Sequence, residues 1–414
     1  MKLVFRVSDM TDHEPPIVHG ELWSAKQNQG NPIHGFSYRG CYKSTLPSFF
    51  ISRLTKVGDT VYDPFMGRGT TLLEAGLMGR SVSGSDANPI SPMIVAPRLS
   101  PPSMAQIKER LSFFKWGSWS RRMGRWERKN PVQYGDLSPF FHKDTLADVL
   151  MLRDMLCDCD PHSVDGWIRM VVMAILTGHS PGFLSRYSLP PGNTASPEAQ
   201  RSINVKYDKM FERKDVSALI EAKSARFLAG GGVADLTGSR LFVRSADDLS
   251  IVSGNSVQLV MTSPPFVDVI DYAKENWMRM WFGGVAKTYS HAIQAQSRFP
   301  QIWNSSSMAG WEDLMNGSMR EMLRILKPGG FAAIEVGEIR KGSEPLDERV
   351  TRLAKEVGFL PVSVFINCQK FTKAAHIWGV NNQVKGTNTN RIVLLRKPGG
   401  PLFDYAGTFS DLSL

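Results

Sequence analysis

The stretch TVYDPFMGRGTTLLEAGLMGRSVSGSDANP, residues 60–89, predicts the fold of this chain. Apolar and aromatic residues lead to Asp63, and a turn with two glycines then enters a run with helical spacing. A second short apolar segment ends in an acidic turn at Asp86. Strand, helix and strand in this order predict parallel strands covered by helices, and therefore an α/β fold with a mostly parallel sheet.

The rest of the chain continues this pattern with one long interruption. Strand patterns resume at SRLFVRS and SVQLVM and continue to RIVLLRK near the end. Before SRLFVRS, from about residue 100 onward, the segments are helical, more polar and broken by SPPS, LPPGN and LAGGGV. We therefore expect residues 1–99 to form an N-terminal segment and the first half of the α/β domain. Residues 100–240 are expected to form a largely helical insertion, and residues 241–414 the second half.

The composition indicates a globular protein with a polyanionic partner. The chain has 414 residues, 42% of them hydrophobic, and a formal net charge of +10. Its four cysteines show no CxxC pair, which predicts reduced thiols and no metal site. The start has no signal-peptide pattern, and the longest apolar run, WIRMVVMAILTG, is too short to span a bilayer. A soluble, cytoplasmic protein of prokaryotic or phage type is expected.

The turn DPFMGRGTT suits close approach of a ligand. Gly67 and Gly69 follow Asp63 at the carboxyl end of a predicted strand, where ligands bind in open α/β sheets. No Gly-Lys-Ser/Thr follows at the spacing of a phosphate loop. Asp86, at the end of the next strand, suits a ribose diol. Together these features favour an adenosine-containing ligand without phosphates, although two glycines alone also fit an ordinary tight turn.

A second chemical motif is TSPPF, residues 262–266, which follows the apolar run VQLVM. Two prolines cannot continue a helix or donate ladder hydrogen bonds, so they fix a rigid corner at the end of a buried strand. The corner presents two hydrogen-bond acceptors, the Ser263 oxygen and the Pro264 carbonyl. The preorganised corner would need no rearrangement during reaction.

These motifs resemble those of the S-adenosylmethionine-dependent DNA amino-methyltransferases. DPFMGRGTTLLEA resembles their cofactor loop, GSDANP their ribose-binding strand end, and TSPPF the catalytic loop of the cytosine-N4 members. The resemblance implies a Rossmann-like class I methyltransferase fold, S-adenosylmethionine as cofactor and duplex DNA as partner. It also implies the catalytic residues Ser263, Pro264, Pro265 and Phe266, with Phe266 as a flat face for a flipped base.

The resemblance also implies a set of cofactor-binding residues. Tyr42 is included through the segment YRGCY, and Ser245 and Asp247 stand near the position where the family often has Gly-Asp. The full set is Tyr42, Asp63, Pro64, Phe65, Gly67, Gly69, Thr70, Asp86, Ala87, Asn88, Ser245 and Asp247.

The insertion carries a basic segment from Lys108 to Lys129. Eight lysines and arginines stand against two glutamates, and Trp116, Trp119 and Trp126 are interleaved with them. This pattern fits phosphate contacts and stacking on nucleic acid, but also a solvated helix face with inward tryptophans. The Gly/Pro-rich run after residue 177 predicts a long functional loop. The candidate DNA-binding residues are Arg121, Arg122, Arg125, His179, Arg186 and Tyr187.

The sequence therefore favours a site-specific DNA methyltransferase acting on cytosine N4, with a cognate restriction endonuclease as a possible partner. Three alternatives stay open. The same fold methylates adenine N6, and the same geometry could serve an RNA base. From a different class, the chain could be an inactive DNA-binding subunit, although an intact glycine turn, Asp86 and Ser-Pro-Pro-Phe argue against it.

Overall fold

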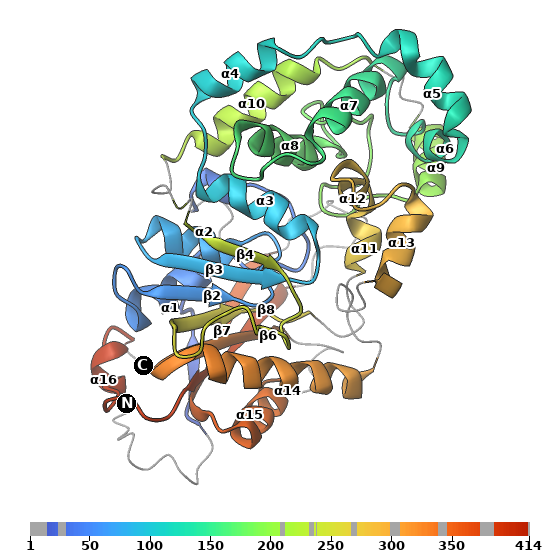
Figure 1. Cartoon of the computed structure of the whole chain (residues 1–414). Helices are drawn as coiled ribbons and strands as arrows, with labels where there is room; N and C mark the ends of the chain where they lie inside the picture. Colours follow the sequence, from blue (N-terminus) through green and yellow to red (C-terminus); the bar gives the residue numbers. More distant parts are fainter. Residues whose placement is uncertain are drawn as a thin grey trace.

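An eight-stranded sheet organises the described part of the chain, in the strand order β1-β7-β8-β6-β5-β2-β3-β4 (Figure 1). The computed structural model describes residues 15–23, 30–207, 212–231, 236, 238–265, 271–298, 307–337, 346–372 and 385–412. The strands are β1 (Ile17–Gly20), β2 (Thr60–Asp63), β3 (Ser81–Asp86), β4 (Arg240–Val243), β5 (Val257–Thr262), β6 (Leu326–Gly337), β7 (Leu360–Thr372) and β8 (Lys385–Arg396).

The sheet is mixed but mostly parallel, which confirms the predicted Rossmann-like α/β fold. Among the described strands, β8 alone runs antiparallel to its neighbours β6 and β7. The chain places β3 and β4 on one side of β2, and then β5 and β6 on the other. The strand order therefore reverses between β2 and β5, and the carboxyl ends of these two strands form the crevice where α/β sheets bind ligands.

Alternate residues of the central strands face two different helical layers. Val61 and Leu259, paired across β2 and β5, join the hydrophobic cluster that contains α1 (Thr45–Leu54), α2 (Thr70–Leu77) and α3 (Ile90–Leu99). The next pair, Tyr62 and Val260, joins the cluster with α14 (Met308–Ile325) and α15 (Leu346–Val357). This is the period of two expected for strands buried on both faces.

A second helical layer covers α3 on the side away from the sheet (Figure 1). Its core is α8 (Val164–Ile175), whose Trp167 and Ile168 are fully buried in the same cluster as Val61. The layer therefore shares one continuous core with the sheet. Its other helices are α4 (Met104–Ser112), α5 (Met123–Lys129), α6 (Pro131–Leu137), α7 (Lys143–Leu156), α9 (Pro197–Tyr207), α10 (Val216–Leu228), α11 (Tyr272–Glu275), α12 (Trp277–Phe282) and α13 (Tyr289–Arg298).

Short elements complete the described chain: the 3-10 turns η2 (Pro32–His34) and η3 (Ser120–Arg122), and α16 (Tyr405–Thr408). Within the described ranges, no helix combines the length and apolarity that crossing a bilayer requires.

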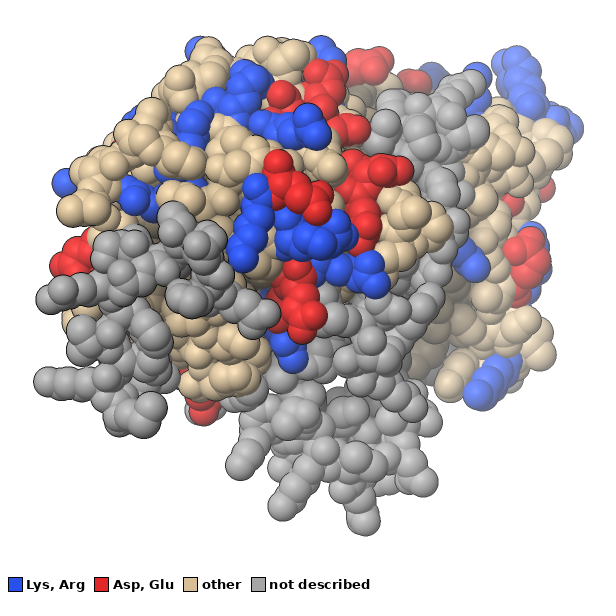
Figure 2. Space-filling view, turned by 90° about the horizontal axis from the view of Figure 1, so that it is seen from below, with Lys and Arg blue, Asp and Glu red and all other residues tan. Residues whose placement is uncertain are grey.

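The side of the molecule with α14 and α15 carries mixed charge. Figure 2 shows basic and acidic side chains interspersed there, without a field of one sign. Glu312 lies 2.7 Å from Arg349 and 3.0 Å from Arg352, and Asp347 lies 2.8 Å from Arg391. Because these arginines are paired with carboxylates, this side is a poor candidate for phosphate binding.

Candidate active site

The turn between β2 and α2 requires its glycines for a structural reason. Gly67 and Gly69 both have positive φ, 49° and 79°, which side chains with a Cβ rarely adopt. A Cβ on Gly69 would also lie 2.7 Å from the Cγ1 atom of Val95 on α3. Because these positions are glycines, the turn can pass close to α3. The helix α2 then begins at Thr70, directly after Gly69.

Asp86, at the end of β3, holds this turn from the neighbouring strand. Its Oδ2 accepts a hydrogen bond from the Gly67 N–H at 2.7 Å, and its Oδ1 accepts one from the Asn88 N–H at 2.8 Å. Burial raises the pKa of Asp86 to about 6, although the hydrogen bonds from Asn88 and Gly67 oppose the shift. At pH 7 and above, Asp86 presents a mostly ionised acceptor to the cavity.

Asp63, at the end of β2, is almost completely buried and joins two strand ends. Its Oδ1 accepts hydrogen bonds from the Thr262 hydroxyl at 2.5 Å and from the Phe65 N–H at 3.1 Å. Burial raises its pKa to about 7, against the opposing effect of the hydrogen bonds from Thr262, Phe65 and Thr71. Asp63 thereby ties the glycine turn to the start of TSPPF.

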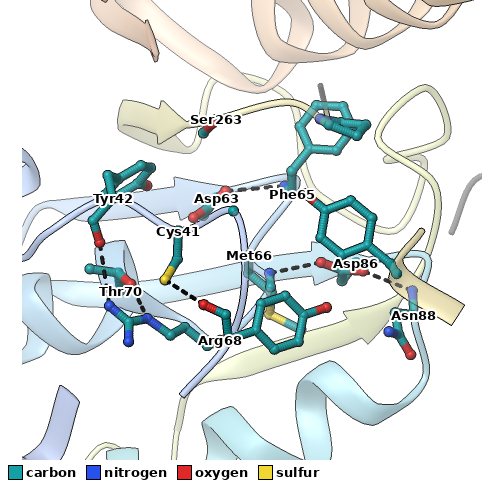
Figure 3. Close-up of a pocket in the computed structure, with 15 residues that line it drawn as sticks. Cys41, Tyr42, Asp63, Phe65, Met66, Arg68, Thr70, Asp86, Asn88 and Ser263 are labelled. Atoms are coloured by element: carbon teal, nitrogen blue, oxygen red, sulfur yellow. Dashed lines mark hydrogen bonds between the residues drawn. The ribbon is translucent and has the colours of Figure 1, made fainter. Parts of the chain in front are cut away.

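One cavity brings the predicted cofactor and catalytic motifs together (Figure 3). Its wall includes Ser263 and Pro265 from the corner after β5. Of the predicted cofactor residues, Tyr42, Asp63, Phe65, Gly67, Thr70, Asp86 and Asn88 line it. It is also lined by Tyr38, Gly40 and Cys41, which belong to the segment YRGCY that the resemblance matched to a cofactor segment. Met66, Arg68 and Tyr272 line it as well, and sequence reasoning did not assign these three to the cofactor.

Other predicted residues lie outside this lining. Pro64, Gly69 and Ala87 are chain neighbours of lining residues and shape the turns. Ser245 donates a hydrogen bond to Asp247, which is exposed after β4. The cofactor-binding role predicted for Ser245 and Asp247 therefore remains a prediction.

The Ser263 hydroxyl donates a hydrogen bond to Glu335 Oε2 at 2.6 Å, and Asn390 Nδ2 donates to Glu335 Oε1 at 2.9 Å. Glu335 is only 3% exposed. Burial raises its pKa, and the hydrogen bonds from Ser263 and Asn390 oppose that shift. Sequence reasoning missed Glu335, although a lone acid in the apolar run FAAIEVG was a usable signal, since buried charges need partners.

The rest of the proline corner is held rigidly. Pro264 is buried, and the Pro265 carbonyl accepts a 3.0 Å hydrogen bond from the Trp311 Nε1–H of α14. The Pro265 carbonyl is therefore anchored to α14. Pro264 is not among the residues lining the cavity, and the acceptor role of its carbonyl stays a prediction. Phe266, the predicted stacking face, lies outside the described residues.

The cavity contains a buried donor suited to a ligand with nitrogen or oxygen acceptors. Asn88 is 2% exposed and lines the cavity, and its Nδ2 has no acceptor in hydrogen-bond geometry among the described residues. The Tyr38 phenol is close enough for Asn88 to lower its pKa, against a larger raising effect of burial. Asn88 Nδ2 therefore lies in the cavity beside the Tyr38 oxygen, and it can donate a hydrogen bond to an acceptor of a bound ligand. This arrangement fits an adenosine group.

The basic segment of the insertion is divided between surface and core. Arg121, Arg122 and Arg125 are exposed on η3 and α5. Trp116, Trp119 and Trp126 are instead partly buried and packed against the hydrophobic core. This agrees with the inward interpretation of the tryptophans, and stacking of their exposed parts on nucleic acid stays a prediction. Phosphate contact by the arginines stays a prediction.

The predicted long loop after residue 177 is tied to the helical layer. The Arg186 N–H donates to the Phe140 carbonyl at 2.8 Å, and the Tyr187 ring lies 4.9 Å from the Tyr207 ring. His179 is exposed, and its ring lies 6.3 Å from that of Phe183. None of His179, Arg186 and Tyr187 is among the residues lining the described cavity.

Comparison with known proteins gives one family match and one curated relative. A family described as DNA methylase, covering N6 and N4 methyltransferases, matches residues 7–91. Type II methyltransferase M.MjaII from Methanocaldococcus jannaschii is 35% identical over 90 residues. That alignment covers 22% of this chain and only 17% of that protein's length. The matched residues of this chain include the glycine turn and Asp86.

Solved structures give weaker likenesses. A SAM-dependent methyltransferase from Methanosarcina mazei is 9% identical, with a TM-score of 0.31 over 85% of this chain and 98% of that one. TrmN from Thermus thermophilus is 13% identical, with a TM-score of 0.32 over 88% of this chain and 52% of that one. The fold described above rests on the strand order of this chain itself.

Proposed function

We propose that this chain is an S-adenosylmethionine-dependent methyltransferase that methylates the N4 amine of cytosine in duplex DNA. The observation that carries the proposal is the meeting of Ser263 with Asp63 and Asp86 in one cavity at the switch point of the sheet. The family match over residues 7–91 supports it, because that segment supplies much of the cavity.

The cofactor would be held by groups that the cavity already presents. Asp86 would accept hydrogen bonds from the ribose hydroxyls, and Asn88 Nδ2 would donate to the adenine ring. The glycine turn would allow the backbone to approach the ligand closely. Bound S-adenosylmethionine supplies an electrophilic methyl group on a positively charged sulfur.

Ser263 would activate the target amine. Its hydroxyl proton is donated to Glu335, so its oxygen lone pairs remain available to accept a hydrogen bond from the amine. Accepting that hydrogen bond draws electron density toward the amine nitrogen and orients it. The carbonyl of Pro264 would accept the other amine hydrogen. Because the corner is fixed, this arrangement needs no reorganisation as charge develops.

Glu335 would receive the proton that the amine loses, through the Ser263 hydroxyl. A transfer along this path moves the hydroxyl proton to Glu335 Oε2 while Ser263 takes one from the methylated nitrogen. The raised pKa of Glu335, caused by burial, makes the carboxylate a better proton acceptor than an exposed glutamate. Asn390 would keep the carboxylate oriented toward Ser263 throughout.

Nucleic acid would be held by the helical layer. Arg121, Arg122 and Arg125 would contact phosphates, and the segment with His179, Arg186 and Tyr187 would contribute to target recognition. The target base would leave the duplex to reach Ser263, with Phe266 as its stacking face. A restriction-modification role, with a cognate endonuclease as partner, belongs to the same proposal.

The test is to incubate the protein with S-adenosylmethionine and duplex DNA of mixed sequence, and in parallel with structured RNA. Digestion to nucleosides and mass spectrometry then identify the methylated base. We expect N4-methylcytosine from DNA. N6-methyladenine or a methylated RNA base would overturn the substrate while keeping the methyltransferase, and cofactor binding without any methylated product would favour the inactive-subunit alternative.

A further inference from the structure

One face of α11 and α12 contacts, at three successive points, the chain segment that carries Tyr38 of the cavity wall. Tyr272, Glu275 and Arg279 are spaced by three and four residues, so they lie on the same side of the helical segment. This segment begins shortly after the Ser-Pro-Pro corner in the chain. Its partners lie in residues 36–42, which we call the wall segment.

The first two contacts are aromatic and ionic. The Tyr272 ring stacks on the Tyr38 ring, with centroids 6.1 Å apart and planes at 26°, and both residues line the cavity. Glu275, 7% exposed, pairs through Oε1 with the Arg39 guanidinium, whose side chain is 49% exposed. The other oxygen of Glu275 has no hydrogen-bond partner among the described residues, so Arg39 is important for keeping this buried carboxylate charged.

The third contact comes from Arg279, which is 4% exposed. Its Nη2 donates to the Ser37 carbonyl at 2.8 Å, and its guanidinium lies 4.7 Å from the centre of the buried Phe36 ring. Arg279 therefore holds the wall segment through both its backbone and a side chain. Together the three contacts fix residues 36–39 against α11 and α12.

The same helices also hold the insertion. The Glu275 carbonyl accepts a hydrogen bond from the Thr194 N–H at 3.2 Å, and Trp277 Nε1 donates to the Ala195 carbonyl at 2.9 Å. Arg279 Nε donates to the Met173 carbonyl at 3.2 Å, at the end of α8. One helical segment thus contacts the cofactor wall, follows the catalytic corner and supports the layer expected to hold nucleic acid.

We propose that the Tyr272–Glu275–Arg279 face is a clamp that couples cofactor binding to nucleic-acid binding. This inference rests on the proposed function, because it assumes both ligands. A cofactor that orders the wall segment also orders α11 and α12, and these helices then hold the insertion in its binding arrangement. By linkage, nucleic acid must tighten cofactor binding by the same factor. The three residues act as positioning residues, not as catalytic ones.

The test uses Arg39→Met, which removes the exposed partner of the clamp while keeping most of its apolar stem. Affinity for a DNA duplex is measured with and without saturating S-adenosylmethionine, using Ser263→Ala protein to prevent turnover. We expect the cofactor to tighten DNA binding by about 5- to 150-fold in the parent, the usual range for coupled sites. Arg39→Met should reduce this ratio to within about twofold of one, and Arg39→Lys should restore part of it.

Arg53→Met is the matched control, because Arg53 also pairs with a carboxylate, Asp411, and lies 4.0 Å from the centre of an aromatic ring, Phe49. Its described hydrogen-bond partners are Phe49, Ser52 and Asp411, none of which belongs to the wall segment, so the ratio should stay at the parent value. If Arg39 were only a phosphate contact, Arg39→Met would weaken DNA binding equally in both states. An unchanged ratio, or a parent ratio of one, overturns the clamp.

A second measurement does not depend on either ligand. Amide hydrogen exchange of residues 36–42 in the free protein should accelerate in Arg39→Met and not in Arg53→Met, since the clamp restrains local opening. Equal exchange in the parent and Arg39→Met would overturn the clamp even if the protein binds no cofactor. Absence of cofactor binding in the parent would instead contradict the proposed function, so the two failures are distinguishable.

Discussion

Ser263 and Glu335 are joined by a 2.6 Å hydrogen bond between neighbouring strand ends, with the hydroxyl donating to a carboxylate that is 3% exposed. The bond orients the Ser263 oxygen and directs its hydroxyl proton toward Glu335, which leaves the oxygen lone pairs free to accept a hydrogen bond. It also places a proton acceptor of raised pKa beside the proposed reaction centre. The first two predictions separate these two effects.

Ser263→Ala should lower kcat by about 100- to 1000-fold, the usual effect of removing one preorganised hydrogen-bonding group. The serine oxygen acts on the amine mainly as charge develops, so KM for cofactor and DNA should change little. Steady-state kinetics with separate binding measurements check this. A fully active variant would contradict the proposed mechanism.

Glu335→Gln should lower kcat. Ser263 keeps its hydrogen-bond acceptor in this variant, because the glutamine amide oxygen can still accept a hydrogen bond from the Ser263 hydroxyl. A glutamine cannot take up the proton that the amine loses, so activity should also lose its dependence on a group titrating above the usual range for glutamate. The pH profile of kcat is the measurement. Asn390→Asp serves as a comparison. The aspartate has nearly the same shape as Asn390, but its negative charge beside Glu335 opposes ionisation of that carboxyl group. An unchanged profile in Glu335→Gln would assign Glu335 a purely structural role.

Asp86→Ala should weaken cofactor binding, because hydrogen bonds to a charged group contribute roughly 1.5–3 kcal/mol. The pKa of Asp86 in the folded protein is raised to about 6 by burial, so parent affinity should also fall as pH drops through that value. Isothermal calorimetry from pH 5 to pH 8 checks both points. Equal affinity in parent and variant would leave Asp86 as a turn residue only.

Asp63→Asn should change the pH dependence of stability. Burial raises the folded-state pKa of Asp63 from 3.8 to about 7, so between these values the folded state binds more protons than the unfolded state. Parent stability should therefore fall as pH rises through this window, by an amount on the order of a few kcal/mol. The amide that replaces the carboxyl group cannot ionise, so the variant should lose this component. Denaturant unfolding at pH 5.5 and 8.5 measures the difference, and identical slopes for the two proteins would contradict the prediction.

Reversing Arg121, Arg122 and Arg125 to glutamate should weaken DNA binding for all sequences and flatten its salt dependence. Cofactor affinity should stay unchanged, because none of the three lines the described cavity. The matched control reverses three exposed cations of α14 and α15, Arg320, Arg352 and Lys355. If the first triple variant keeps the parent's DNA affinity and the parent's dependence of affinity on salt concentration, these arginines are only solvent-exposed side chains and do not contact DNA.

The sequence alone determined the βαβ beginning, the glycine turn and the proline corner. Each of these depends on local properties: apolar periodicity, the left-handed backbone that favours Gly67 and Gly69, and the restricted φ of two prolines. Parallel strands of an open α/β sheet place their carboxyl ends along one edge. The meeting of Asp63, Asp86 and Ser263 therefore followed from their positions at strand ends.

Only the tertiary structure decided which side chains complete the site. Glu335 reaches Ser263 because β6 pairs with β5 in a register that sets Ile334 beside Thr262, and Asn390 comes from β8, which pairs with β6 in the antiparallel direction. Such registers join residues far apart in the chain, and they are selected by packing of both sheet faces instead of by any local pattern. The inward packing of the insertion's tryptophans and the clamp on the wall segment have the same origin. Each brings together residues that are far apart in the chain, so no local sequence pattern reveals it.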